Sequence, residues 1–149
     1  MSDATRDLVP ATPPPLDGIL ETGIYVEDLD RAAAFYSDVF GLAPVMRDSR
    51  LVTLDVGGGR VLLLFLRGAS TRQAELPGGS IPPHDGSGPM HFAFAAEHAD
   101  MSAWEEHLTR LGVPVESTLD WPNGSRSLYF RDPDGHLVEI ASRGLWKRS

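Results

Sequence analysis

The sequence predicts an α+β fold of two tandem βαβββ modules, in which a curved mixed sheet forms a cup and the helices cover its outer face. The order strand, helix, strands occurs twice along the chain, and a shift of 70 residues places Ile24 on Phe94 and Pro44 on Pro114. The strands of both halves carry bulky apolar residues at alternate positions, which is typical of a sheet with one covered face. The predicted divisions are an N-terminal arm at 1–17 and a single domain at 18–149, made of module one (about 18–67), a connecting segment (68–89) and module two (about 90–142).

Composition limits the possible function classes. The chain has 149 residues, 42% hydrophobic content and a formal net charge of −8, which fits a globular domain with a proper core. With zero cysteines, disulfides and thiolate ligands are excluded, and imidazole and carboxylate remain as strong metal ligands. The scattered basic residues argue against nucleic-acid binding. Because the start MSDATRDLVP lacks an apolar core segment and no stretch approaches the roughly 18 apolar residues of a membrane span, we expect a cytoplasmic protein without membrane contact.

Module one follows an arm in which VPATPPPLD favours an extended chain, disordered or poorly packed. Residues 19–26 read as a strand, and DLDRAAAFYSDVFGL then reads as a helix. We expect Asp28 or Asp30 to cap this helix and Gly41 to end it. LVTLDV and RVLLLFL flank three glycines and are expected to form a hairpin.

Module two repeats this order. MHFAFAA reads as a strand, and DMSAWEEHLTRLG reads as a helix with Trp104, Leu108 and Leu111 on one face. The strands PVES, SRSLYFR and HLVEIAS follow, with the turn DPDG between the last two.

The connecting segment at 68–89 is too long and too rich in glycine and proline for a plain connection. It is interpreted either as a lid or crossover, or as a tolerated surface insertion.

Three polar residues lie opposite the bulky faces of their strands. Successive side chains of a strand point to opposite sides, so Glu21 opposes Ile24, His91 opposes Phe92 and Glu139 opposes Val138. The shift of 70 residues also places Glu21 on His91.

Two carboxylates and an imidazole that converge in a cup need a cation or a polar ligand between them. We therefore predict a divalent metal site of Glu21, His91 and Glu139, with Glu21 and Glu139 as the catalytic carboxylates. The alternative is that both glutamates are half-exposed strand residues and that His91 is a hydrogen-bonded strand histidine.

The segments VEDLDRAAAFYSDVFGL, GPMHFAFAA and SLYFRDPDGHLVEIAS resemble the vicinal oxygen chelate superfamily, which includes glyoxalase I, bleomycin-resistance proteins and extradiol dioxygenases. The resemblance covers about residues 19–142 and is closest to its glyoxalase-like or dioxygenase-like members. It implies the glyoxalase/bleomycin-resistance/dioxygenase fold, and it implies that the family's metal ligands fall on Glu21, His91 and Glu139.

Two departures from the family pattern reduce the number of reactions expected of this chain. Glyoxalase I takes a fourth ligand from the last strand of its first module, where this chain has Leu63. Extradiol dioxygenases use two histidines and one glutamate, and Glu21 stands here in place of a histidine. These departures disfavour a true glyoxalase I and an Fe(II) dioxygenase. A different lyase, an isomerase or a transferase is favoured instead.

A Glu/His/Glu set leaves coordination positions for water or for two substrate oxygens. Carboxylate-rich ligation favours Mn²⁺, Fe²⁺ or Mg²⁺, with Zn²⁺ and Ni²⁺ also possible. The predicted function is a metal-dependent enzyme that chelates a small oxygenated substrate and stabilises an anionic intermediate.

Two other polar residues are candidate substrate contacts. Tyr25 shares the face of Glu21 and either hydrogen-bonds a ligand or lines the cup, and Arg126 either binds a substrate anion or is a surface strand residue. His84 is expected to be a solvated loop histidine, and His136 is excluded as a ligand by its strand parity. The aspartates of the DPDG turn are assigned to turn bonding.

Two other functions stay open. The first is a metal-free protein of the bleomycin-resistance type that sequesters a cationic molecule, and the second is a non-catalytic subunit or sensor. The resemblance also implies a homodimer, often with modules of two chains completing each cavity.

Overall fold

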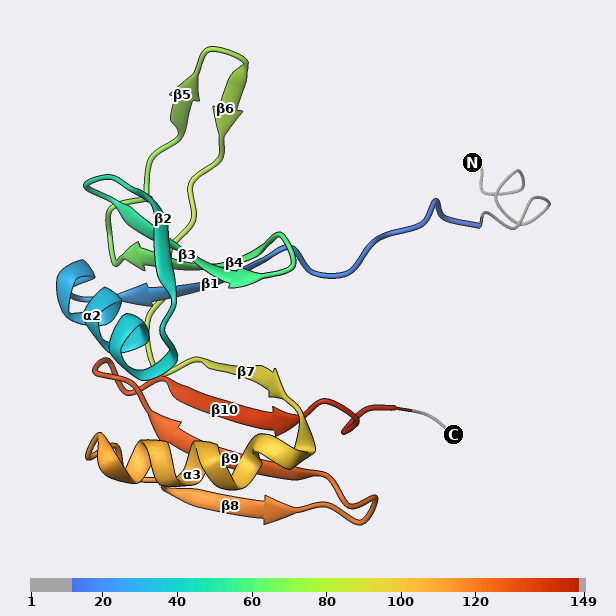
Figure 1. Ribbon diagram of the computed structural model, residues 1–149. Helices are drawn as coiled ribbons and strands as arrows, with labels where there is room; N and C mark the ends of the chain where they lie inside the picture. The colour runs from blue at the N-terminus through green and yellow to red at the C-terminus, as the bar shows by residue number, and fades with distance from the viewer. Residues whose placement is uncertain (1–11, 148–149) are drawn as a thin grey trace.

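A computed structural model describes residues 12–147 of the chain, and Figure 1 shows their arrangement. These residues form two modules, each with a four-stranded mixed sheet and a helix, which confirms the predicted α+β fold. Residues 12–20 are exposed and carry neither helix nor strand, whereas residues 1–11 of the predicted arm lie outside the described residues. No helix within 12–147 is long and apolar enough to cross a membrane.

Module one has the strand order β1-β4-β3-β2. β1 runs parallel to β4, and the other neighbours are antiparallel, which makes the sheet mixed. Its elements are β1 (Glu21–Val26), α2 (Leu29–Phe40), β2 (Ala43–Arg47), β3 (Leu51–Gly57) and β4 (Arg60–Leu66).

Module two has the equivalent strand order, β7-β10-β9-β8, again with its first and last strands parallel. Glu21 and His91 are the first residues of the equivalent strands β1 and β7, as the shift of 70 residues predicts. The strand predicted at PVES (114–117) begins later than expected, because β8 starts at Ser117. The elements are β7 (His91–Ala96), the 3₁₀ turn η1 (His98–Asp100), α3 (Met101–Arg110), β8 (Ser117–Asp120), β9 (Arg126–Arg131) and β10 (Leu137–Ser142).

Helix α2 begins and ends where its sequence predicts. The Asp28 carboxylate accepts a hydrogen bond from the Arg31 backbone N–H at 3.1 Å, which satisfies one free donor of the first turn. Gly41 ends the helix in the left-handed conformation (φ 69°), which glycine adopts without strain. In α3, Leu108 is buried as expected, but Leu111 follows the helix and is 45% exposed. Leu111 was therefore wrongly placed on the packed face.

One hydrophobic core joins the two modules. The Phe40 ring at the end of α2 lies 4.5 Å from Phe94 and 5.5 Å from Trp104, both of module two. α2 therefore packs against the neighbouring module as well as its own sheet, and this contact fixes the two modules beside each other (Figure 1).

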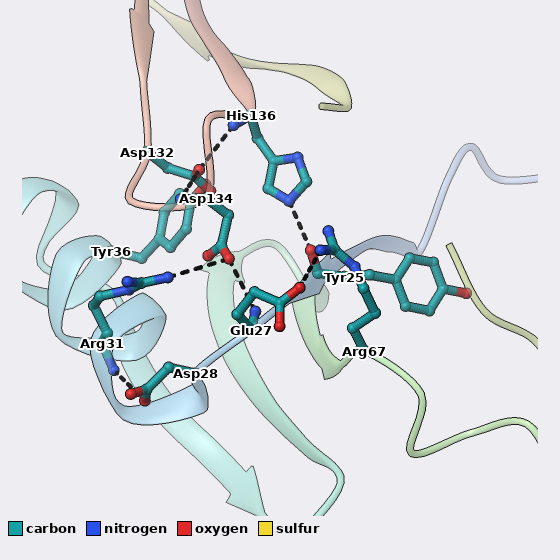
Figure 2. Close-up of polar contacts among 9 residues, drawn as sticks. All are labelled: Tyr25, Glu27, Asp28, Arg31, Tyr36, Arg67, Asp132, Asp134 and His136. Atoms are coloured by element: carbon teal, nitrogen blue, oxygen red, sulfur yellow. Dashed lines mark hydrogen bonds and ion pairs between the residues drawn. The ribbon is translucent and has the colours of Figure 1, made fainter. Parts of the chain in front are cut away.

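The turn between β9 and β10 fastens module two to module one, and we call residues 132–136 the DPDGH latch (Figure 2). Asp132, only 5% exposed, accepts hydrogen bonds from the Tyr36 hydroxyl at 2.7 Å and from the backbone N–H groups of Asp134 and His136 at 2.9 Å each. Burial and the Asp132 carboxylate raise the pKa of Tyr36, which keeps its hydroxyl a donor.

The other two polar residues of the latch, Asp134 and His136, bond to residues in and near β1. Asp134 accepts from the Glu27 backbone N–H at 2.9 Å and pairs with Arg31 at 3.3 Å. His136 is fully buried, and its Nδ1 accepts from the Met90 backbone N–H at 2.9 Å while Nε2 donates to the Tyr25 carbonyl at 2.7 Å. Both ring nitrogens of His136 are thus engaged in holding the modules together. The turn bonding predicted for the aspartates is present, and the contacts with module one add a role that the sequence did not indicate.

The connecting segment contains a small hairpin, β5 (Ala74–Leu76) with β6 (Gly79–Ile81), which projects away from both modules (Figure 1). The sequence analysis did not predict this hairpin within the segment. The two ends of the segment meet where the His84 backbone N–H donates to the Ser70 carbonyl at 2.9 Å, and the His84 ring contacts Tyr25 of β1.

Candidate metal centre

His91 and Glu139 meet on the face of the second sheet that α3 does not cover. β7 and β10 pair in parallel with His91 opposite Leu137, so Glu139 lies two residues further on the same face. The His91 Nε2 atom lies 3.2 Å from Oε1 of Glu139. The Glu139 side chain is 8% exposed, whereas that of His91 is 50% exposed. The pair is thus a buried carboxylate beside an imidazole that solvent or a ligand can reach.

The hydrogen bonds of this pair leave two acceptors facing each other. His91 Nδ1 lies 2.9 Å from the Leu137 carbonyl, which only accepts, so Nδ1 carries a proton. In the neutral ring Nε2 then has a lone pair, and it points at a carboxylate oxygen. Either a second proton or a metal ion must lie between them. A distance of 3.2 Å suits two neighbouring ligands of one cation with bond lengths of roughly 2.0–2.2 Å.

Neighbouring side chains orient the Glu139 carboxylate. The Ser127 hydroxyl donates to Oε2 at 2.6 Å, which leaves Oε1 turned toward His91. Burial raises the pKa of Tyr129, and the Glu139 carboxylate raises it further. Sequence reasoning missed Ser127 and Tyr129, although both alternate with Leu128 and Phe130 on β9 and so share the face of Glu139.

Glu21 lies in a different part of the same chain. It is exposed on β1 and lines a cavity of about 660 Å³ on the open face of the first sheet. Within residues 12–147 of one chain, no three His, Asp or Glu side chains come close enough to hold a metal ion together. The structure thus brings His91 and Glu139 together and keeps Glu21 apart from them.

The cavity beside Glu21 has a mainly apolar wall. Leu63, which stands where glyoxalase I is expected to have a fourth ligand, belongs to this wall. Polar and charged lining residues are Glu21, Arg50, Thr53, Ser70 and His84.

His84 faces this cavity, contrary to the expectation of a solvated loop histidine. Its Nδ1 lies 2.6 Å from the Tyr25 hydroxyl, and its ring packs edge-on against Phe65 with 4.6 Å between centroids. Burial raises the pKa of Tyr25, and the Asp85 carboxylate raises it further. A Cβ atom on Gly86 would lie 2.4 Å from the Tyr25 ring, so glycine is required for this close packing.

Arg126 does not share the face of Glu139. It alternates with Ser127 on β9, and its guanidinium binds Glu105 of α3 at 3.0 Å and Asp120 of β8 at 2.9 Å. These ion pairs hold the side chain on the helix side of the sheet. The Arg126 side chain therefore lies away from His91 and Glu139, contrary to its prediction as a substrate contact.

The sequence matches the family model described as the Glyoxalase/Bleomycin resistance protein/Dioxygenase superfamily over residues 18–140. The chain belongs to this superfamily.

Among curated relatives, the metallothiol transferase FosB of Bacillus licheniformis is 30% identical over 124 residues, which is 83% of this chain and 73% of the relative. The metallothiol transferase FosB of Shouchella clausii is 25% identical over 135 residues, 89% of this chain and 85% of the relative. Among solved structures, a lactoylglutathione lyase from Agrobacterium tumefaciens has 42% identity and a TM-score of 0.83, covering 91% of this chain and 100% of that chain.

Proposed function

We propose that the protein is a divalent-metal-dependent lyase, isomerase or transferase that chelates a small oxygenated substrate. The observation that carries the proposal is the 3.2 Å contact between Nε2 of His91 and the buried Glu139 carboxylate, with Nδ1 of His91 turned to the Leu137 carbonyl. A cation bound between the two groups would stabilise this arrangement. The transferase and lyase names of the relatives support the same broad class.

The proposed metal ligands are His91 and Glu139 of one chain and Glu21 of a second copy. Support for two copies comes from the separation of Glu21 from His91 and Glu139 within one chain and from the partly apolar cavity beside Glu21. The chain would then act as a homodimer, with two equivalent sites. Its carboxylate-rich ligand set favours Mn²⁺, Fe²⁺ or Mg²⁺, with Zn²⁺ and Ni²⁺ as further candidates.

When bound, the metal would polarise the substrate oxygens and so favour loss of a neighbouring proton. The hydrogen bond from Ser127 fixes the orientation of the Glu139 carboxylate, which suits a residue that would stay bound to the metal throughout the reaction. Glu21 is exposed beside the cavity and is the carboxylate that can accept a proton from the substrate. The Tyr25 hydroxyl holds the His84 ring at the cavity wall by a hydrogen bond. His84 would contact the substrate directly, and Tyr25 would act by positioning it. We further propose a cytoplasmic location, with which a chain without cysteines is compatible.

Metal content tests the proposal directly. Protein purified without a metal-binding tag and dialysed against Mn²⁺, Co²⁺ or Zn²⁺ is expected to retain about one ion per chain by elemental analysis. His91→Ala is expected to weaken that affinity at least about a hundredfold, because the imidazole is a direct ligand. His98→Ala removes an exposed histidine outside the pair and should leave affinity unchanged.

A wild-type protein that retains none of these ions would contradict the proposal. It would favour a metal-free protein that sequesters a small molecule.

A further inference from the structure

The apolar part of the cavity runs along β4. Val61, Leu63 and Phe65 alternate on one face of this strand and form a continuous floor. The register places Val61 opposite Glu21 and Phe65 opposite Tyr25. At roughly 3.3 Å per residue, this floor extends about 13 Å away from Glu21.

Aromatic and apolar groups line the far end of the floor. Leu51 pairs with Phe65 across β3 and β4 and also lines the cavity. The His84 ring packs on Phe65, and its Nδ1 is already engaged with the Tyr25 hydroxyl. Leu51 and Phe65 therefore offer an apolar surface to a ligand, while Arg50, Ser70 and His84 line the cavity beside them.

The charge of the wall also restricts the ligand. Among the described lining residues, Arg50 is the single cation, and Glu21 is assigned to the metal. A compact molecule with several negative charges would need several cationic partners to replace its hydration. The wall is better matched to a molecule whose bulk is apolar.

We propose that the substrate carries an extended apolar body next to the two oxygens that meet the metal, and that this body lies along Val61, Leu63 and Phe65. This inference rests on the proposed function, because the metal end of the molecule is placed by Glu21. The occupant is a substrate rather than a protein segment, because the floor continues directly from a metal ligand.

Straight-chain hydroxamic acids test this inference, because they chelate metals through two neighbouring oxygens and differ only in tail length. The Co²⁺-loaded protein is titrated with acetohydroxamic, butanohydroxamic and hexanohydroxamic acids, and the visible absorption of Co²⁺ reports binding. Affinity is expected to rise roughly two- to fourfold for each methylene that the floor covers. The same series with aqueous Co²⁺ gives the intrinsic dependence on tail length.

Leu51→Asn places a polar side chain at the end of the cavity far from Glu21. It is expected to remove most of the gain for hexanohydroxamic acid and to leave acetohydroxamic acid unaffected. Leu111→Asn, at an exposed leucine beyond α3, is the matched control and should behave as wild type.

The outcomes separate the two proposals. If no hydroxamate changes the Co²⁺ spectrum, the metal site itself is wrong. If acetohydroxamic acid binds but affinity does not rise with tail length, the metal site stands and the apolar substrate is wrong. A Leu51→Asn chain that loses its dimer by light scattering, with tail-length dependence unchanged, would assign the floor to a second copy of the chain and overturn the inference.

Discussion

Replacing Asp132 by alanine is expected to lower the free energy of unfolding by about 3 kcal/mol or more. The substitution leaves the Tyr36 hydroxyl in the core without its acceptor and removes the partner of two backbone N–H groups in the DPDGH latch. Urea denaturation followed by circular dichroism, at one protein concentration for all variants, measures the change.

Asp55→Ala is the matched control for this effect. Asp55 also bonds a backbone N–H of its own hairpin, that of Gly57 at 2.8 Å, but it is exposed and lies near the end of β3 in module one. Its loss is expected to cost less than about 1 kcal/mol. Equal costs at the two positions would show that Asp132 acts as an ordinary turn residue and that the latch adds no stability between modules. A double-mutant cycle of Asp132→Ala with Tyr36→Phe isolates the buried hydrogen bond.

Mixing two inactive variants is expected to restore metal sites if Glu21 comes from a second chain. In the proposed homodimer, Glu21→Ala and His91→Ala would each remove a ligand from both metal sites. In a mixed dimer one site carries both changes and the other carries neither. Random mixing by co-refolding is therefore expected to recover about one quarter of the wild-type number of tight Co²⁺ sites per chain.

The pair His91→Ala with Glu139→Ala is the control for this experiment. Both residues belong to the same half-site, so each site of a mixed dimer lacks one of them and no recovery is expected. Recovery with the first pair and none with the second would support the shared site. Failure of the first pair, with mixed dimers verified by mass spectrometry, would contradict it.

The meeting of His91 and Glu139 could be predicted from the sequence because it depends on strand parity and on neighbouring strands within one module. The duplicated order of elements places β7 beside β10, and the alternation of side chains then puts both residues on the open face. The same alternation, applied to SRSLYF, would have selected Ser127 and Tyr129 and rejected Arg126.

The place of Glu21 relative to the other two residues could not be predicted in this way. It depends on how one module packs against the other, which is decided by contacts such as Phe40 with Trp104 and by the buried His136. These contacts join residues far apart in the chain, and neither periodicity nor spacing contains them. The β5–β6 hairpin was also missed, although its Pro-Gly-Gly turn is a recognisable signal.

The projecting β5–β6 hairpin offers a position for a spectroscopic label. Gly78 at its tip has nothing within 4 Å of an added Cβ, and the chain contains no cysteine. A Gly78→Cys chain would therefore carry one maleimide label or nitroxide at a single known point. In a homodimer the two labels form a matched pair, so pulsed electron resonance would read out the spacing of the subunits without any other alteration of the molecule.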